Sequence, residues 1–393
     1  MSARRFALVA GGGTGGHVVP AVAVARGLAA GRPDAVELVG ARRGLDPELL
    51  AGVGLPVTLL PGRGLVRRRD LRALARNAAA VASLLAALVA AVVLVARRRP
   101  AVVVAMGGYA SVASALAAAA LRVPVVLVNV DVVPGAANRL VSRVATACAV
   151  GYPGTPLRRA VVTGVPVGEA VARAARPGPV ERAAARAALE VPPDRAVVAV
   201  VGGSLGAQRL NEAAIDLARR WHDRGDAAVY HVVGRRDAPW AATAAPGSAR
   251  SVPPEEPGRL WYRQVPFEER MALFYQAADV VVARAGANTV AELAVVGVPA
   301  LLVPLPGAPG DHQGRNAAVL VEAGGAVLVP DAECTGERLD AELGSLLADP
   351  PRLAAMARAA ASVGRPDALE AVLGLVLSRA RTGAPVPARA DAR

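Results

Sequence analysis

The sequence predicts an α/β protein with two Rossmann-like halves, each built around a parallel β-sheet. Short runs rich in valine and leucine alternate with helix-like stretches, which is typical of parallel sheets covered by helices on both faces. The alternation starts afresh near residue 196, and in both halves a glycine-rich loop follows the first strand. A chain of 393 residues is long enough for two domains of ordinary size.

The N-terminal half follows a strand–helix order. We expect strands at residues 6–10, 36–40, 57–60, 101–106 and 123–129, and helices at 19–30 and 112–121. The uncharged apolar segment 78–96 is long enough to span a bilayer. Because nine of its residues are alanine and an α/β fold needs a buried crossover helix here, we interpret it as a core helix instead.

The second half follows a stretch rich in glycine and proline, residues 151–168, which we interpret as the crossing between domains. We expect strands at 196–201, 228–233, 280–283 and 300–303, and a helix at 211–220. The predicted domains are residues 1–160 and 161–364, with a helix at about 365–381 packing back on the first domain and a frayed tail at 382–393. Ligands bind such sheets at the carboxyl ends of the strands, so two facing halves would enclose a cleft.

Composition narrows the possible functions. All 45 basic residues are arginine, and with 32 acidic residues they give a formal net charge of +13. Only 3% of the residues are aromatic and none is interleaved with the arginines, so nucleic acid is not an expected partner. The arginine clusters at 67–76 and 97–99 flank the apolar segment, which is typical of a solvated surface or of a helix lying on an anionic membrane. The two separated cysteines exclude a cysteine-ligated zinc site and fit a reducing cytoplasm.

The first glycine-rich loop, residues 11–17, ends in a histidine. Its G-x-G-x-x-G spacing makes a nicotinamide-dependent oxidoreductase the obvious alternative. That class carries an acidic residue at the end of the second strand, whereas here Arg42 and Arg43 follow Gly40, which leaves open only a 2′-phosphate version. His17 is placed at the start of a helix, where an imidazole can take a proton from a hydroxyl near neutral pH.

Two loops of the second half suit a pyrophosphate. In the loop 202–208, backbone amides and the Ser204 hydroxyl can hold phosphate oxygens. In the segment 284–292, small residues precede Asn288 and Thr289 at a helix start, where free amides favour an anion. Glu292 lies one turn farther on, and its carboxylate is suited to ribose hydroxyls; the structural alternative is a capping-box partner of Thr289.

Three other loops offer polar groups at strand ends. The turn 310–316 carries His312, Gln313 and Asn316, whose side chains suit sugar hydroxyls. The loops 107–111 and 131–139 share the predicted sheet edge of His17 and are expected to face a second substrate. No carboxylate pair or ligand cluster lies near the phosphate loops, so neither a metal nor another cofactor is expected.

Together, these motifs strongly resemble the MurG family, in unbroken order from about residue 6 to residue 330. The family's GGTGGH loop, GGY loop, PG…N element, GGS.GA…N element and RAGA.TV.E block match residues 12–17, 107–109, 134–138, 202–211 and 284–292. The resemblance implies the GT-B fold, with two Rossmann-like domains across a cleft. It also implies transfer of N-acetylglucosamine from UDP to undecaprenyl-pyrophosphoryl-muramoyl-pentapeptide in peptidoglycan synthesis, with inversion at the anomeric carbon.

The resemblance also implies roles for individual residues. His17 would be the general base on the acceptor hydroxyl, with Tyr109 and Asn138 on the acceptor side. The UDP-sugar would be held by Thr14, Gly15, Gly16, Asp131, Ser204, Ala287, Asn288, Thr289, Val290, Ala291, Glu292, His312, Gln313 and Asn316. The implied partners are the UDP-sugar donor, a polyprenyl-pyrophosphate-linked acceptor and an anionic membrane surface, bound peripherally at its cytoplasmic face.

The chain departs from the family pattern at four places. Residues 128–131 read VNVD where the family has HEQN, with Asp131 as a partial replacement for the sugar-contacting asparagine. Gly168 stands in place of an arginine, Asn288 in place of a leucine, and His312 in place of the first of two glutamines. The departures keep open a related enzyme that glycosylates another lipid or a secondary metabolite. The alternative of a different class is a non-catalytic subunit that binds a nucleotide sugar.

Overall fold

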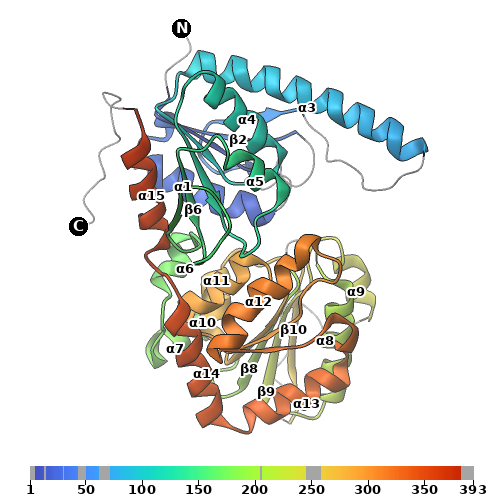
Figure 1. The fold of residues 1–393 in the computed structure, drawn as a ribbon. Helices are drawn as coiled ribbons and strands as arrows, with labels where there is room; N and C mark the ends of the chain where they lie inside the picture. Colours follow the sequence, from blue (N-terminus) through green and yellow to red (C-terminus); the bar gives the residue numbers. More distant parts are fainter. Residues whose placement is uncertain are drawn as a thin grey trace. The chain divides into compact units, whose positions relative to one another are not determined.

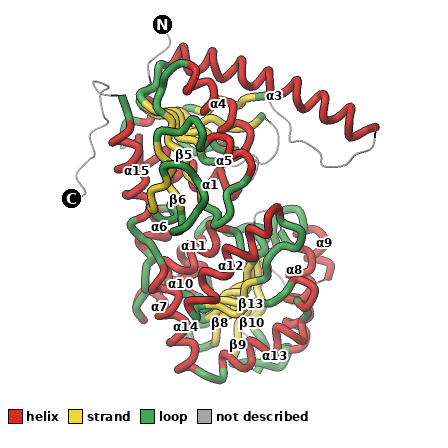
Figure 2. The backbone as a smooth tube through the Cα atoms, viewed as in Figure 1, coloured by secondary structure: helices red, strands yellow, loops and turns green. Residues whose placement is uncertain are grey.

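The computed structural model of the chain describes residues 5–12, 15–29, 31–42, 50–61, 71–203, 206–244 and 258–381, with the backbone alone over 71–82. The chain divides into two compact units. The N-terminal unit runs to Gly168 and resumes at Asp367, and the C-terminal unit is Glu169–Pro366. In each unit the strands gather in the middle and helices lie on both sides of them (Figure 1, Figure 2).

The N-terminal unit is built on a parallel sheet. Its strands within the described residues are β1 (Ala7–Ala10), β2 (Val36–Ala41), β3 (Val57–Leu60), β4 (Val102–Ala105), β5 (Val125–Asn129), β6 (Ala147–Val150) and β7 (Ala160–Val162). They are ordered β3-β2-β1-β4-β5-β6-β7, and every pairing is parallel. The chain order therefore reverses between β1 and β4.

Alternation along the strands divides the core of this unit into two layers. Ala7 and Val9 of β1 pack with α1 (Gly15–Ala29) and with α15 (Ala368–Arg379), the helix that returns from the end of the chain. Leu8 and Ala10 face the other layer, formed by α3 (Leu71–Arg98) and α4 (Gly108–Ala120). Burial on both faces explains why the central strands β1 and β4 are entirely apolar. The described part of this unit also contains the short α5 (Ala136–Val141) and the 3-10 turn η1 (Pro33–Ala35).

Helix α3 presents two different apolar stripes. Ala87, Ala91 and Val95 recur at a spacing of four residues and are buried in the core. Leu85, Val89 and Val93 recur at the same spacing on another stripe and are 61%, 65% and 43% exposed. No helix among the described residues is long and apolar enough to cross a membrane. The core-helix interpretation of residues 78–96 is supported on the stripe formed by Ala87, Ala91 and Val95, which packs in the core of this unit.

The C-terminal unit repeats the architecture. Its strands are β8 (Ala196–Val201), β9 (Ala227–Val232), β10 (Trp261–Val265), β11 (Val280–Ala283), β12 (Ala300–Leu302) and β13 (Ala326–Leu328), in the parallel order β10-β9-β8-β11-β12-β13. Its helices are α6 (Glu169–Arg173), α7 (Pro179–Ala188), α8 (Gln208–Arg220), α9 (Ala238–Ala244), α10 (Met271–Ala277), α11 (Ala287–Val296), α12 (His312–Ala323), α13 (Gly336–Leu347) and α14 (Pro350–Val363), with 3-10 turns η2 (Pro309–Asp311) and η3 (Asp331–Glu333). Leu210 of α8, the C-cap residue Trp221 and Leu339 of α13 pack on one face of the sheet.

The predicted two-sheet α/β class is confirmed, with corrections to individual elements. The crossing expected at residues 151–168 contains strand β7, in which Val161 and Val162 follow Ala160 along the edge of the sheet. The sequence pattern also missed β6, β10 and β13, which are short or interrupted by polar residues. Helix α1 begins at Gly15 rather than near residue 19, so the end of the glycine loop is already helical.

Both sheets place their glycine loops at a topological switch point. In the N-terminal unit, the loops after β1 and β4 leave adjacent strands at the position where the strand order reverses. In the C-terminal unit, the loops after β8 and β11 do the same. Open parallel sheets bind ligands at such positions, because the connections diverge to opposite faces there. The topology thus selects two loops in each unit as candidate site elements.

Candidate functional site

In the N-terminal unit, the two switch-point loops touch through their backbones. The amide of Gly12 donates to the carbonyl of Gly107 at 3.3 Å, and the amide of Met106 donates to the carbonyl of Ala10 at 2.7 Å. Gly107 has φ 107° and Gly108 has φ 79°, which are conformations that side chains with a Cβ rarely adopt. These glycines let the GGY loop approach the first glycine loop closely.

His17 lies in the first turn of α1, partly exposed, with its ring over Gly107. A Cβ on residue 107 would lie 2.5 Å from His17 Cδ2 and 2.7 Å from Nε2. The two glycine motifs, about ninety residues apart in the chain, therefore position one imidazole between them. Tyr109 is the second residue of α4 and is also partly exposed next to this contact.

The loop after β5 is held by two asparagines. Asn138 is buried, and its Nδ2 donates to Asn129 Oδ1 at 2.8 Å. Asn129 Nδ2 donates in turn to the carbonyl of Asp131 at 2.6 Å. Asn138, predicted on the acceptor side, therefore ties α5 to the end of β5, whereas Asp131 is partly exposed in the bend that follows.

In the C-terminal unit, the switch-point helix α11 begins at Ala287, with Gly286 as its N-cap and no side chain capping it. The amides of Ala287, Asn288 and Thr289 belong to the first turn, where no intrahelical acceptor exists. No acidic residue occupies this turn. The capping-box alternative for Glu292 is wrong, because Thr289 lies inside the helix rather than at its N-cap. The start of α11 is therefore suited to bind an anion.

Glu292 follows one turn farther along α11. Its Oε2 accepts a hydrogen bond from the Tyr275 hydroxyl of α10 at 2.8 Å. Burial raises the pKa of the Glu292 carboxyl to about 7, and the Tyr275 hydrogen bond opposes that shift. Burial likewise raises the pKa of Tyr275 well above its ordinary value, so its hydroxyl stays protonated and donates. Tyr275 was not predicted, although a tyrosine in the apolar run 271–278 is the kind of buried polar group that needs a partner.

The loop after β8 rests on a buried hydrogen-bond network. Asn211 Nδ2 donates to the Val233 carbonyl at 2.9 Å and to Asp237 Oδ2 at 3.1 Å, so its Oδ1 accepts from His231 Nε2 at 3.0 Å. His231 Nδ1 then accepts from the Tyr262 hydroxyl at 2.9 Å. Burial lowers the pKa of His231 to about 3, which keeps the ring neutral with one proton on Nε2. A Cβ on Gly206 would lie 2.5 Å from Asp237 Oδ2, so the loop packs directly on this network.

The three predicted sugar-binding residues around the start of α12 have different hydrogen-bond partners. Gln313 Oε1 accepts from the Leu305 amide at 2.9 Å, which leaves its NH₂ group to donate. His312, the first residue of α12, has Nδ1 at 3.1 Å from the Pro309 carbonyl. Asn316 is fully buried and its Nδ2 donates to the Ala285 carbonyl at 3.4 Å, so it supports the loop before α11.

The remaining predicted donor residues are backbone positions or lie outside the described residues. Gly15 and Gly16 open α1, and Val290 and Ala291 are buried in α11. Thr14 and Ser204 fall outside the part of the chain that the structure describes. Within that part, no group of three or more His, Cys, Asp or Glu side chains could hold a metal ion.

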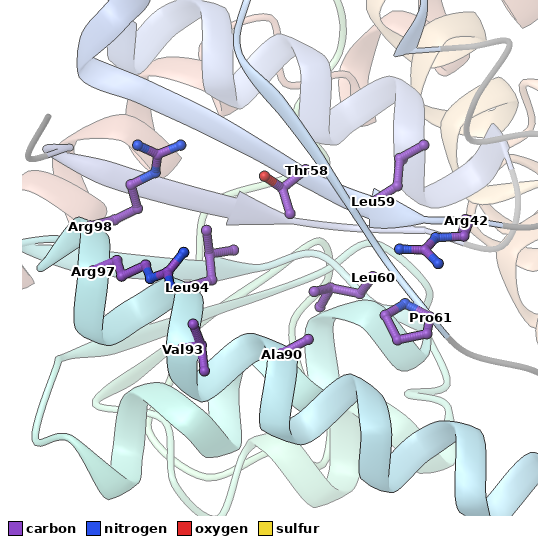
Figure 3. Close-up of a pocket in the computed structure, with 10 residues that line it drawn as sticks. All are labelled: Arg42, Thr58, Leu59, Leu60, Pro61, Ala90, Val93, Leu94, Arg97 and Arg98. Carbon is purple, nitrogen blue, oxygen red and sulfur yellow. The ribbon is translucent and has the colours of Figure 1, made fainter. Parts of the chain in front are cut away.

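A separate cavity of about 710 Å³ lies in the N-terminal unit between β3 and α3 (Figure 3). Its walls are partly apolar, from Leu59, Leu60, Val93 and Leu94, and it carries three arginines: Arg42, Arg97 and Arg98. Arg98 Nε lies 2.7 Å from an oxygen of the buried Glu37. Glu37 lies near the start of β2 and is not the ribose-binding acid that an oxidoreductase carries at the end of this strand.

Known proteins share both the sequence and the fold. Family models for the glycosyltransferase family 28 N-terminal and C-terminal domains match residues 7–150 and 197–372. The UDP-N-acetylglucosamine–N-acetylmuramyl-(pentapeptide) pyrophosphoryl-undecaprenol N-acetylglucosamine transferase of Alkalilimnicola ehrlichii is 42% identical over 377 residues, which cover 95% of this chain and 99% of that protein. The chain belongs to the MurG family.

Solved structures agree with this membership. The crystal structure of MurG from Acinetobacter baumannii matches with a TM-score of 0.71 and 27% identity, over 95% of this chain and 99% of that one. The calicheamicin glycosyltransferase CalG4 shares the fold alone, with a TM-score of 0.63 at 17% identity, over 97% of this chain and 100% of that one. The predicted GT-B class and the MurG resemblance are confirmed, and both domain models of glycosyltransferase family 28 match this chain.

Proposed function

We propose that this chain transfers N-acetylglucosamine from UDP-N-acetylglucosamine to undecaprenyl-pyrophosphoryl-N-acetylmuramoyl-pentapeptide, a step of peptidoglycan synthesis. One observation carries the proposal: 42% identity to a transferase of this name over nearly the whole of both chains. The two halves supply complementary chemistry, with a base in the N-terminal unit and an anion-binding helix start in the C-terminal unit.

In the N-terminal unit, His17 is the proposed general base. Its ring lies against Gly107 in the first turn of α1, so the backbone of the GGY loop fixes where the imidazole can lie. Removing the proton from the acceptor hydroxyl makes that oxygen the nucleophile on the anomeric carbon. The displacement inverts the anomeric centre, because the nucleophile attacks opposite the departing UDP. Tyr109 is proposed to contact the acceptor.

In the C-terminal unit, the start of α11 is the proposed pyrophosphate site. Backbone amides of its first turn, together with Ser204, would stabilise the negative charge that develops on UDP as the sugar departs. Glu292 would accept hydrogen bonds from the ribose hydroxyls. Gln313 offers its NH₂ group, and His312 its ring, to the sugar. Gly15, Gly16, Asp131 and Asn316 stay proposed donor-side residues, with Asn316 acting through the Ala285 carbonyl.

Binding and turnover test the proposal in sequence. A thermal-shift panel of nucleotide sugars should identify UDP-N-acetylglucosamine as the strongest stabiliser, and a lipid-acceptor assay should then show transfer. We expect His17→Ala to lower kcat by about 100-fold or more, whereas His222→Ala, at an exposed histidine, should retain activity. If no uridine nucleotide stabilises the protein, the proposal is wrong; if His17→Ala keeps full turnover, another residue is the base.

The altered segment at residues 128–131 favours one alternative acceptor. Asn129 and Asp131 engage each other through a side chain and a backbone carbonyl where the family pattern has HEQN. Transfer to a different polyprenyl or small-molecule acceptor, with the muramoyl lipid inactive, would support that alternative. UDP-sugar binding without transfer or hydrolysis would indicate a non-catalytic binding subunit.

We propose an anionic membrane surface as the physical partner of α3, with the protein bound peripherally at the cytoplasmic face. The stripe Leu85, Val89 and Val93 is exposed and apolar, and Arg97 continues it one turn farther along. Apolar side chains flanked by arginines suit the boundary between lipid headgroups and acyl chains. The cavity beside this stripe, with Arg42 and Arg97 on its walls, offers the same combination (Figure 3).

A further inference from the structure

The buried Tyr275 and the half-buried Glu292 form a hydrogen-bonded pair near the start of α11. Tyr275 is 1% exposed, and its hydroxyl lies 2.8 Å from Glu292 Oε2. The ring is held by Phe274, whose own ring meets it edge-to-face with centroids 5.6 Å apart. A second helix, α10, thereby fixes the side chain that α11 carries.

The hydrogen bonds of Glu292 leave acceptor capacity for a ligand. Within the described residues, Tyr275 is the one side chain that donates to its carboxylate, and it occupies Oε2. A buried carboxylate of a purely structural kind is paired more fully. In the same unit, Glu268 accepts from the Tyr230 hydroxyl at 2.7 Å and also from the amide and guanidinium of Arg270. Glu292 has no arginine of this kind, so Oε1 keeps its lone pairs for another donor.

We infer that Tyr275 is a positioning residue for donor recognition: its hydroxyl holds the Glu292 carboxylate in the one orientation in which Oε1 meets the ribose hydroxyls. This inference rests on the proposed ribose contact of Glu292. Without the hydroxyl, Glu292 would sample several rotamers and would be ordered only when the donor binds. A contact held in advance costs less on binding, so the hydroxyl acts on donor affinity rather than on the chemical step.

The alternative is that Tyr275 only fills space in the core. Phenylalanine fills almost the same volume, so packing alone does not require the hydroxyl. A buried hydroxyl also costs stability unless it is hydrogen-bonded, and its partner here is the residue proposed to hold the ribose. Space filling and positioning therefore predict different results for Tyr275→Phe.

The experiment compares UDP with its 2′-deoxy analogue, dUDP, by calorimetry on the full chain. Wild type should bind UDP more tightly than dUDP, because dUDP lacks one ribose hydroxyl. Tyr275→Phe should weaken UDP binding by about tenfold and dUDP binding by about twofold or less, so the preference for ribose shrinks. In turnover, the KM for the UDP-sugar should rise while kcat stays nearly constant.

Tyr230→Phe is the matched control. It removes a buried tyrosine hydroxyl from a carboxylate of the same unit, and Glu268 keeps its Arg270 hydrogen bonds. This variant should lose similar thermal stability but keep the wild-type ratio of UDP to dUDP affinity. If Tyr275→Phe also keeps that ratio, Tyr275 does not position Glu292 and the inference is overturned.

A second test combines Tyr275→Phe with Glu292→Gln and compares the double variant with each single variant, so it does not rest on the folding of one variant alone. If Tyr275 acts through Glu292, adding Tyr275→Phe to Glu292→Gln should cause no further loss of UDP affinity; an independent, additive loss contradicts the inference. Failure of the proposed function looks different. If wild-type protein binds UDP and dUDP equally well, the proposed contact between Glu292 and the ribose is wrong, and the role of Tyr275 is wrong with it.

Discussion

The imidazole of His17 lies directly over Gly107, so close that a Cβ at residue 107 would come within 2.5 Å of its Cδ2 atom. Gly107 also has φ 107°, a conformation that disfavours any other residue. The glycine is therefore part of the arrangement that orients the proposed base.

We expect Gly107→Ala to lower kcat by about 100-fold, because the new methyl group displaces the His17 ring and misplacement by about 1 Å is costly for proton transfer. A transferase assay with saturating donor measures the effect. Gly154→Ala is the control in the same unit, since Gly154 also has a positive φ, 74°, but a Cβ there meets no atom within 4 Å. Equal activity of the two variants would argue that the contact with Gly107 does not orient His17.

Donor binding should depend on pH through Glu292. Burial raises the pKa of its carboxyl to about 7, and the ribose hydroxyls donate more strongly to the ionised carboxylate than to the neutral acid. The Kd of UDP-N-acetylglucosamine should therefore fall as the pH rises towards 7 and level off above it, with at most about a tenfold change per pH unit on the acid side. The diphosphate of this donor keeps its charge across that range. Calorimetry on Glu292→Gln should give a weaker affinity with a nearly flat profile; a steep profile in that variant would assign the titration to another group.

Acid should destabilise the C-terminal unit through His231. The pKa of this ring is about 3 in the folded protein and 6.5 in its ordinary state, so below pH 6.5 the unfolded chain binds a proton that the folded chain does not. Stability is thus complete above pH 6.5 and is lost as the pH falls towards 3, by about 1.4 kcal/mol per pH unit from this group.

Urea unfolding at pH 7, 6 and 5 tests this expectation. His231→Gln should be less stable at pH 7, because the bonds to Asn211 and Tyr262 are altered, but its stability should fall less steeply with acid than that of wild type. His222→Gln, at an exposed position, should keep the wild-type slope. Parallel curves for wild type and His231→Gln would contradict the assignment.

Vesicle binding should depend on the exposed stripe of α3. Val89→Gln removes apolar surface from a side chain that is 65% exposed, and we expect binding to anionic vesicles to weaken by about fivefold. Val180→Gln, at a valine of α7 that is 77% exposed, is the matched control and should bind as wild type does. Co-sedimentation with vesicles at low and high salt measures the binding of both variants. The same loss of binding in both variants would contradict a role of α3 in membrane binding.

The sequence alone was sufficient for the fold class, the family and most strands. Buried parallel strands are nearly uniform runs of valine, leucine and alanine, as in β1, β8 and β11. Such runs can be recognised in the sequence without a structure. The glycine loops could also be recognised in the sequence, because the spacing of their glycines reflects backbone conformations that few other residues adopt. Strand β7 was missed because it has only three residues and lies in a segment rich in glycine and proline, and β10 because Arg263 and Gln264 interrupt its apolar residues. Pairing with a neighbouring strand decides the conformation of both.

Only the tertiary structure decided what individual polar side chains do. Asn138 and Asn316 were predicted at the substrate, and the structure adds that Asn138 holds Asn129 and Asn316 supports Ala285. Tyr275 was not predicted at all, because its partner Glu292 lies seventeen residues away on another helix. Local sequence determines backbone conformation and burial pattern. The partner of a polar side chain depends on which distant segments the fold brings within about 3 Å, and this distance is set by packing rather than by spacing along the chain.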